Sequence, residues 1–536
     1  MKNNNPEWAK DIIWYQIFPE RFAGFNHSKI QEKFDFKKDW YAMTKHESRK
    51  YHSLYKAVNY RKAGGTIQGI IEKLDYIKEI GFNGIYLTPF FPSPSCHKYD
   101  SRCFHHVEEF FGPLPGYDLL KMKRANENEN PASWVITNAD EKFAEFVKRC
   151  HDRNIKVIAD GVFNHSGREF FAFADILDKK EKSKYKNWYN ITKWNVENAD
   201  GFEYSGWYGH NSLPEFRKTS DGLMDNEYME YIKNVLKKWF NYFNVDGIRL
   251  DAADCISHNF WKKFNTMVRE IKSDAYLVGE IWQIEPDYVS KKEFNALMNY
   301  PFAYNSVEYF VDRIDFSLFK KNVEYLVNSY DYNNILLMQN LYSSHDTARL
   351  INIINNPGIN FRHSSHYQKT CLASNPQYNI GRGDNYSDLT RRMMIVFQFI
   401  FPGCPMVYYG DEVGMEGAND PDCRKPMLWE EFKYEDEKTH PFSSFKIPER
   451  NKPDKELKKF YSEMIMLRHK EKCLTHGSFK IIDLKNNDFF GIERTYGNDS
   501  IIVYFNRGEN SVNIRPGLIL APMSFKIIKN NEKILL

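Results

Sequence analysis

Short apolar runs alternate along the chain with segments whose apolar residues recur at helical spacing. Five early runs are IIWYQIF (12–18), GIYLTPF (84–90), IKVIADGVF (155–163), VDGIRLD (245–251) and AYLVGEIW (275–282). Three later runs are FNALMNYPF (294–302), NILLMQNLYSSHD (334–346) and PMVYYGDE (405–412). Such runs are typical of strands, and the amphipathic segments 67–81 and 139–154 are typical of crossover helices. The pattern predicts eight strands separated by helices.

Eight near-continuous apolar strands favour an α/β fold of the (β/α)8 TIM barrel type, because strands buried on both faces form parallel sheets. An open doubly wound sheet is the alternative, although no glycine-rich phosphate loop follows the first strand. Two segments interrupt the alternation. Residues 166–225 are rich in aromatic residues, Gly and Asn, and predict an excursion domain after the third strand. Residues 351–386 form a long polar segment that is either a lid or an insertion.

The end of the chain has a different pattern. Beyond residue 445, short strand-like runs are separated by turn signals such as Asn-Asn and Gly-Asn, which predict hairpins. We therefore expect a catalytic barrel over residues 1–445, including the excursion, and an antiparallel β-sandwich domain over residues 446–536.

Composition narrows the function classes. The 536 residues carry a net charge of +3 with acidic and basic residues interspersed, so the chain lacks the concentrated positive field of nucleic-acid-binding proteins. No run of apolar residues is long enough to span a membrane, and the first residues lack the pattern of a secretory leader. Eight scattered cysteines without CxxC spacing argue against a disulfide framework or zinc fingers. We expect a cytoplasmic protein with no nucleic-acid or membrane partner.

Charged residues stand at the ends of the predicted strands, where barrels of this type build their active sites. Asp160 ends the third strand, and Glu280 follows the fifth. Arg249 and Asp251 are two residues apart and share one face of a strand, so the guanidinium is expected to keep the carboxylate ionised. An apolar strand end beside Trp282 favours a protonated Glu280 that can donate. An ionised carboxylate facing a carboxylic acid is the arrangement used for glycoside hydrolysis.

The sequence resembles the α-amylase superfamily, glycoside hydrolase family 13. Its four signature regions are similar to DGVFNH, GIRLDAAD, GEIW and SSHD, which occur here in the same order. Other stretches, among them HSGREFFAF (165–173), MNYPFA (298–303) and GANDPDCRKPMLW (417–429), resemble the neopullulanase and cyclomaltodextrinase branch. Members of that branch commonly carry a preceding β domain, whereas the first predicted strand here begins near residue 12.

The resemblance implies a role for each matched residue. Asp251 would be the nucleophile, Glu280 the general acid and base, and Asp346 the third carboxylate, which binds and distorts the sugar. The resemblance also implies substrate-binding or supporting roles for Arg249, His165, His345, Tyr99, Asp100 and Asp160. The implied reaction is a double displacement with retention, for which the two reacting carboxyl groups stand roughly 5 to 5.5 Å apart.

No cofactor is expected to be required. Asn164 resembles a calcium-ligating position of true α-amylases, but calcium takes six to eight oxygens, and the Lys-His that follows the nucleophile in those enzymes is absent. Calcium is therefore possible but not expected to be obligatory, and no metal ligand is predicted. The oligomeric state stays open between monomer and homodimer.

The sequence thus predicts a retaining α-glucan hydrolase. Its substrates would be maltooligosaccharides, cyclomaltodextrins, pullulan or starch, cleaved at α-1,4 and possibly α-1,6 bonds. The alternatives are an α-amylase or an α-glucan transglycosylase and, more distantly, a catalytically silent carbohydrate-binding protein. All three carboxylates that catalysis requires are present, which disfavours the silent protein.

Overall fold

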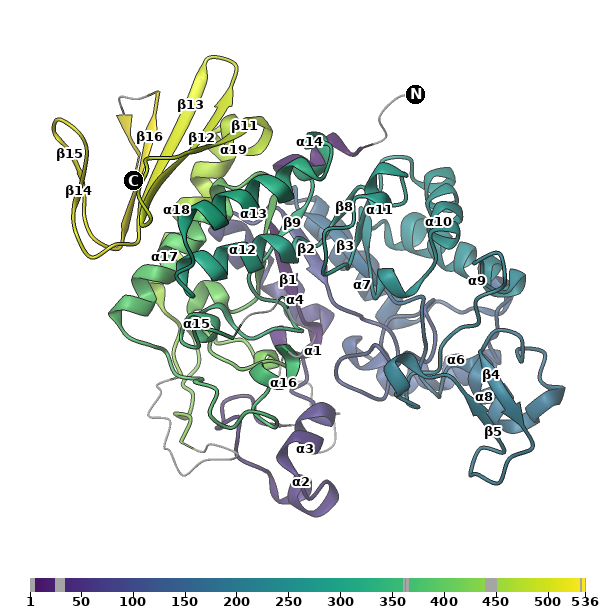
Figure 1. The fold of residues 1–536 in the computed structure, drawn as a ribbon. Coiled ribbons are helices and arrows are strands. Elements are labelled where there is room, and N and C mark those ends of the chain that lie inside the picture. Colours follow the sequence, from purple (N-terminus) through teal and green to yellow (C-terminus); the bar gives the residue numbers. More distant parts are fainter. Residues whose placement is uncertain are drawn as a thin grey trace.

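A parallel sheet of eight strands forms the centre of the computed structural model, which describes residues 5–24, 34–359, 362, 366–438, 451–530 and 533–535 (Figure 1). Its strands are β1 (Trp14–Ile17), β2 (Gly84–Leu87), β3 (Lys156–Gly161), β6 (Gly247–Leu250), β7 (Tyr276–Gly279), β8 (Ala296–Leu297), β9 (Gln339–Asn340) and β10 (Cys404–Tyr408). Each overlaps one of the apolar runs named above, so the eight predicted strands are confirmed.

The sheet closes on itself. Its strand order is β8-β7-β6-β3-β2-β1-β10-β9, and every neighbouring pair is parallel. The two outer strands meet through a parallel bridge between Met298 and Gln339, and the Asn299 N–H donates to the Gln339 carbonyl at 2.8 Å. Apart from the half-buried Lys156, all strand residues are buried, as strands covered on both faces require. The predicted (β/α)8 barrel is confirmed.

Helices surround the strands (Figure 1). Those described in the barrel are α1 (Pro19–Phe22), α4 (Ile67–Glu72), α5 (Leu74–Ile80), α6 (Pro115–Ala125), α7 (Asn138–His151), α9 (Asn226–Lys237), α10 (His258–Ile271), α11 (Asp287–Ser290), α12 (Tyr300–Phe310), α13 (Phe316–Asn328), α14 (Tyr332–Ile335), α15 (Leu350–Ile354), α16 (His366–Thr370) and α17 (Asn385–Ile400). Segment 67–81 forms two helices that meet at Lys73 and end at Gly81, whose φ of 110° suits glycine. Helix α7 begins with a capping box at Thr137.

Two predicted strands are shorter than their apolar runs. In 294–302, only Ala296–Leu297 is strand, because the Asn299 side chain accepts from the Phe302 N–H and caps α12. Pro301 stands in the first turn of that helix, where it is tolerated. In 334–346, helix α14 takes the first residues and strand β9 only two. The polar side chains that cap α12 and α14 therefore shorten the strands relative to the apolar runs.

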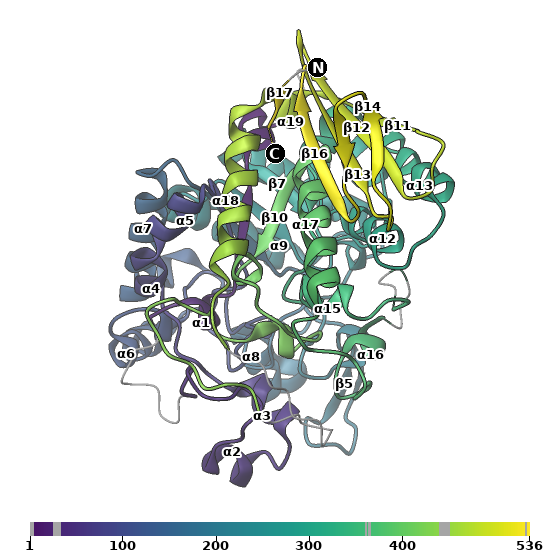
Figure 2. The ribbon, with the colours of Figure 1, turned by 90° about the vertical axis from the view of Figure 1, so that its left-hand side faces the viewer.

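The predicted excursion follows β3 and contains α8 (Phe171–Lys179) and the antiparallel pair β4 (Ile191–Trp194) and β5 (Phe202–Tyr204). Trp188 and Tyr189 are buried in it, so these aromatic rings form its own core. The excursion lies at the same end of the barrel as α2 (Lys45–Lys50), α3 (Leu54–Tyr60) and α16, opposite the C-terminal sheet (Figures 1 and 2). Residues 360, 361 and 363–365 of the lid-or-insertion segment lie outside the described residues.

The C-terminal part contains two antiparallel sheets, as predicted. One has the order β11-β12-β13-β16-β17 and the other pairs β14 with β15. Their bounds are β11 (Ser478–Ile482), β12 (Phe489–Tyr496), β13 (Asp499–Asn506), β14 (Val512–Arg515), β15 (Leu518–Leu520), β16 (Ser524–Lys529) and β17 (Lys533–Ile534). Helices α18 (Lys455–Lys470) and α19 (Lys472–His476) precede them, and α18 packs against α5 and α17 of the barrel. The predicted boundary at 445/446 lies outside the described residues.

Candidate active site

Arg249 stands at the centre of a cluster of carboxylates at the C-terminal ends of the strands. Its side chain is 0% exposed. The Nη1 atom lies 2.9 Å from Asp160 Oδ1 and 2.9 Å from Asp251 Oδ1, and the Nη2 atom lies 2.8 Å from Glu280 Oε2. One guanidinium therefore balances three carboxylates contributed by three neighbouring strands.

Strand register brings these residues together. Asp160 on β3 is directly paired with Arg249 on β6, and Leu250 is paired with Gly279 on β7. The chain leaves β6 at Asp251 and β7 at Glu280, so both carboxylates emerge at the same rim. The Glu280 N–H donates to the Leu250 carbonyl at 2.9 Å, which continues the ladder up to that rim.

The surroundings of Glu280 are more polar than its sequence context suggested. Its Oε2 accepts from the Ala252 N–H at 3.0 Å, and its Oε1 accepts from Trp282 Nε1 at 3.2 Å. Ala252 itself adopts a left-handed conformation with φ of 44°. The expectation of an apolar environment for Glu280, which came from the strand sequence, is therefore wrong. Hydrogen-bond donors, not apolar contacts, orient this side chain.

Asp251 is held by one oxygen only. Its Oδ1 pairs with Arg249, whereas its buried Oδ2 makes no hydrogen bond to any described residue. Burial raises the pKa of Asp251 well above its usual value, and Arg249 opposes that rise. Burial likewise raises the pKa of Asp160 to about 6, with Arg249 and the Tyr86 hydroxyl acting against it. The expected lowering by Arg249 is thus outweighed, first by burial and then by the negative charges of the neighbouring carboxylates.

His345 and Tyr99 link the seventh strand to this cluster. Gln16 Nε2 lies 2.9 Å from His345 Nδ1, which leaves the Nε2–H of His345 to donate to the Tyr99 oxygen at 2.5 Å. The Tyr99 hydroxyl in turn donates to Asp160 Oδ2 at 3.0 Å, and the two rings stack 5.5 Å apart. Burial lowers the pKa of His345 well below its usual value, so the imidazole is neutral. Asp346 Oδ2 lies 3.1 Å from the same His345 nitrogen.

Arg424 was not recognised as a site residue from the sequence. Its Nη2 donates to Asp346 Oδ1 at 3.0 Å and its Nε donates to the His345 carbonyl at 2.7 Å. Asp420 Oδ1 lies 2.7 Å from its Nη1. The only signal was its place in GANDPDCRKPMLW, which carried a resemblance but no role. Gln16 and Tyr86 were missed as well, because a polar atom inside an apolar strand gives no sign of its partner.

His165 and Asp100 lie beside the Arg249 cluster and do not touch it. His165 is buried, stacks on Trp207 at 5.0 Å, and has no hydrogen-bond partner for its Nε2 among the described residues. Burial lowers the pKa of His165 to about 3. Asp100 Oδ1 accepts from the hydroxyls of Ser93, at 2.6 Å, and Ser95, which stabilises its own loop. Asn164 is buried nearby.

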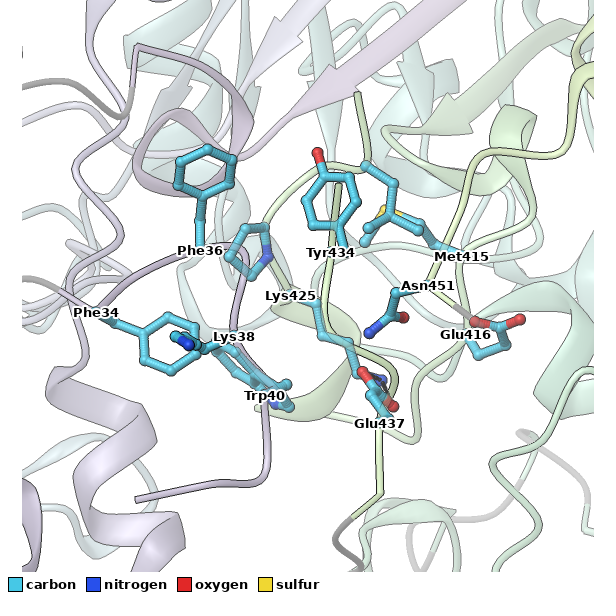
Figure 3. A pocket seen from close by; sticks show the side chains of 12 residues that line it. Phe34, Phe36, Lys38, Trp40, Met415, Glu416, Lys425, Tyr434, Glu437 and Asn451 are labelled. Carbon is cyan, nitrogen blue, oxygen red and sulfur yellow. Dashed lines mark hydrogen bonds and ion pairs between the residues drawn. The ribbon is translucent and has the colours of Figure 1, made fainter. Parts of the chain in front are cut away.

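A separate pocket lies between residues 34–40 and 415–437 (Figure 3). Lys425 and Glu437 point toward each other in it and form a buried ion pair with 2.6 Å between Nζ and Oε1. None of the carboxylates around Arg249 lines this pocket. It is therefore distinct from the candidate active site.

A closed parallel barrel with several carboxylates at its strand ends provides the carboxylate pair that glycoside hydrolases use. The family model described as "Alpha amylase, catalytic domain" matches residues 16–128 and 138–477. The chain belongs to the α-amylase family.

Relatives narrow the branch. The chain is 33% identical over 503 residues to a cyclomaltodextrinase of Thermoanaerobacter pseudethanolicus, covering 94% of this chain and 71% of the relative. It is 30% identical over 513 residues to neopullulanase 2 of Thermoactinomyces vulgaris, with coverage of 94% and 71%. Among solved structures, the ligand-free cyclic α-maltosyl-(1→6)-maltose hydrolase of Arthrobacter globiformis has a TM-score of 0.75 at 25% identity and covers 98% of this chain and 99% of its own. The predicted resemblance is confirmed.

Proposed function

We propose that the protein is a retaining α-glucan hydrolase in which Asp251 is the nucleophile and Glu280 the general acid and base. The observation that supports these roles is that the two carboxylate oxygens of Asp251 differ in their hydrogen bonding. Arg249 holds Oδ1, whereas Oδ2 is buried and makes no hydrogen bond to a residue in the described part of the chain. That oxygen is the one available to attack a sugar bound at the rim.

The reaction proceeds in two displacements. Asp251 Oδ2 attacks the anomeric carbon while Glu280 gives a proton to the departing glycosidic oxygen, so that the C–O bond to the leaving sugar breaks and a covalent β-glycosyl ester forms. Glu280, now ionised, then takes a proton from water as the water oxygen attacks the same carbon. The ester bond breaks, the α-anomer leaves, and both carboxyl groups return to their starting states.

The remaining polar residues bind and orient the sugar. Asp346 is fixed by Arg424 and by His345, which leaves it at the rim with 29% of its side chain exposed. The neutral imidazole of His165 can donate its Nε2–H, which has no partner among the described residues, to a sugar hydroxyl, whereas the Nε2–H of His345 is directed at Tyr99 and Asp346 and positions them. Tyr99 provides a ring next to His345, and Asp160 and Asp100 support the site from behind through Arg249 and the loop after β2.

An aromatic surface beside Glu280 suits a glucan chain. Trp282 stacks on Tyr300 with ring centroids 3.8 Å apart and donates to Glu280, so it lies next to the position of the departing sugar. Tyr208 in the excursion is 76% exposed. Such rings match the apolar faces of glucosyl units. With relatives named for cyclomaltodextrins and pullulan, this supports maltooligosaccharides, cyclomaltodextrins and pullulan as substrates, cleaved at α-1,4 and also α-1,6 bonds.

The proposal includes a cytoplasmic location. All eight cysteines carry free thiols, which suits a reducing compartment, and a relative in Bacillus subtilis is named an intracellular maltogenic amylase. None of the helices in the described part of the chain combines the length and apolarity needed to cross a membrane. No cofactor is proposed for the reaction itself.

Product analysis tests the proposal. The wild type, Asp251→Asn and a control, Asp246→Asn, are incubated with β-cyclodextrin, maltoheptaose and pullulan, and the anomeric form of fresh products is read by NMR. Asp246 is a buried carboxylate at the other end of β6, paired with His151 and Lys156. We expect α-anomeric products from the wild type and the control, and a loss of at least about 1,000-fold in kcat for Asp251→Asn. Activity that survives in Asp251→Asn, or β-anomeric products, would refute the assignment.

A further inference from the structure

Two histidines and a glutamate converge outside the carboxylate cluster. His105 and His106 lie in the segment between β2 and α6, and Glu127 follows the C-cap of α6. One ligand atom from each residue lies within 4.8 Å of the others. Both histidines are buried, and 10% of the Glu127 side chain is exposed. The His-His pair has no recognisable spacing to Glu127 in the sequence, so only the fold brings the three together.

Each of the three side chains is oriented from behind. His106 Nδ1 lies 2.7 Å from Asp140 Oδ2, and His105 Nδ1 lies 2.9 Å from the Tyr231 hydroxyl. Glu127 Oε1 accepts from the Val135 N–H at 2.7 Å. These contacts leave both Nε2 atoms facing Glu127 Oε2, at 2.8 Å from His106 and 3.5 Å from His105. Imidazoles whose second nitrogen is held by a carboxylate or hydroxyl are typical of metal sites.

A purely structural role accounts for only part of this arrangement. His106 bridges Asp140 and Glu127, and Lys238 donates to Asp140 at 2.9 Å, so these groups satisfy one another. His105 is different. Its Nε2 is buried, and its contact with Glu127 Oε2, at 3.5 Å, is too long for a well-formed hydrogen bond, while its ring is clamped flat against Trp134 at 4.2 Å. A buried nitrogen whose partner stands this far away is costly, and an ion between it and Glu127 would complete both groups.

We propose that His105 Nε2, His106 Nε2 and a carboxylate oxygen of Glu127 bind one divalent transition-metal ion of the zinc class. Two imidazoles and one carboxylate suit Zn²⁺, whereas Ca²⁺ and Mg²⁺ take oxygen ligands. Three protein ligands leave a fourth position for water. This proposal revises the expectation that the chain has no metal ligands, which rested on sequence spacing alone.

The ion would have a structural role. The segment that carries His105 and His106 also carries Tyr99 and Asp100, and a shared ion would tie it to the end of α6 at Glu127. None of the three ligands contacts the Arg249 cluster. Metal binding therefore stabilises the loop behind the active site without taking part in the displacement at the sugar.

Metal titration of the full chain tests the site. The protein is stripped with a chelator, and Zn²⁺ is then added in competition with a chromophoric chelator; a parallel sample receives Co²⁺ for its visible absorption. The variants are His105→Gln and Glu127→Gln. His258→Gln is the matched control, because His258 also faces a carboxylate, that of Glu293, but has no second histidine beside it in the part of the chain that the structure describes. Circular dichroism establishes that each variant is folded.

We expect one tightly bound equivalent of Zn²⁺ in the wild type and in His258→Gln, and an affinity at least about 100-fold lower in His105→Gln and Glu127→Gln. Zn²⁺ should raise the unfolding temperature of the first two proteins only. Equal affinity in all four proteins would assign the binding to other histidines and overturn the proposal, as would no binding by the wild type. If either ligand variant fails to fold, Tyr231→Phe, which removes the hydroxyl that contacts His105 Nδ1 and accepts from the Phe104 N–H, should lower the affinity about 10-fold or more.

Discussion

Replacing Arg249 by Met tests whether one guanidinium stabilises the carboxylates of Asp160, Asp251 and Glu280. The side chain is fully buried, and ion-pair distances of 2.8 to 2.9 Å join it to all three. Methionine has a similar length and no charge, so the variant leaves three acidic groups close together without a cation. Removing one partner of a buried ion pair costs about 3 to 5 kcal/mol. We expect a loss of that size in the free energy of unfolding near neutral pH.

The loss in the free energy of unfolding caused by Arg249→Met should be smaller at acidic pH. Burial already raises the pKa of Asp160 to about 6 and that of Asp251 well above its usual value. Without Arg249 these pKa values rise further, so the folded variant binds more protons than the unfolded chain. Groups with a raised pKa in the folded state contribute stability below their unfolded pKa, and lose it as the pH rises through the folded pKa. The variant should therefore gain stability relative to wild type as the pH falls from about 7.5 to about 5.

Chemical denaturation at several pH values measures this difference, and Arg468→Met is the control. Arg468 is equally buried, but it donates to the carbonyls of Phe399 and Gly403 and forms no ion pair with a described residue. Its loss should destabilise the protein by a similar amount at every pH. A deficit in Arg249→Met that does not change with pH would refute the reasoning, because the carboxylates would then not depend on the guanidinium.

Three further changes separate the supporting residues. Arg424→Met removes the guanidinium partner of Asp346. We expect kcat/KM to fall about 100-fold, because a small displacement of an active-site group costs about that factor in rate, and the free energy of unfolding to change less than in Arg249→Met. Unchanged kinetics would exclude a positioning role for Arg424. Tyr86→Phe removes the 2.6 Å hydrogen bond to Asp160 and should cost about 1 to 3 kcal/mol of stability, measured by denaturation, with the active site still functional. Thr137→Ala breaks the capping box of α7 and should cost about 1 kcal/mol with kcat/KM unchanged; a kinetic effect would show that α7 influences the site.

The active-site residues differ in how visible they are in the sequence. Five charged residues interrupt or directly follow apolar strands, where a charge rarely serves the fold alone: Asp160, Arg249, Asp251, Glu280 and Asp346. Arg424 and Gln16 have no such signal. Arg424 follows a cis Asp420–Pro421 bond in an irregular segment, and Gln16 is one polar residue in β1. Arg424 contacts Asp346, 78 residues away in the chain, and Gln16 contacts His345, 329 residues away.

The environment of each carboxylate also depended on the fold. The sequence places Trp282 and apolar residues beside Glu280, which suggested dry surroundings. The structure instead turns the Ala252 N–H and the Trp282 Nε1–H toward the carboxylate. The backbone of the turn after β6 sets the direction of that N–H, and no propensity predicts the left-handed alanine found in this turn. The balance of burial and charge at Asp251 likewise depends on three acids sharing Arg249, which is a property of adjacent strands.

The sequence by itself determined the eight strands, the crossover helices, the excursion, the C-terminal antiparallel sheets and the family. These features rest on local periodicity, on turn residues and on short motifs, all of which are contained within a few neighbouring residues. Only the tertiary structure decided which strand ends meet, which donors face each acid, and that His105, His106 and Glu127 converge. Such contacts join residues far apart in the chain, and their energies depend on burial and on distances that a local pattern does not contain.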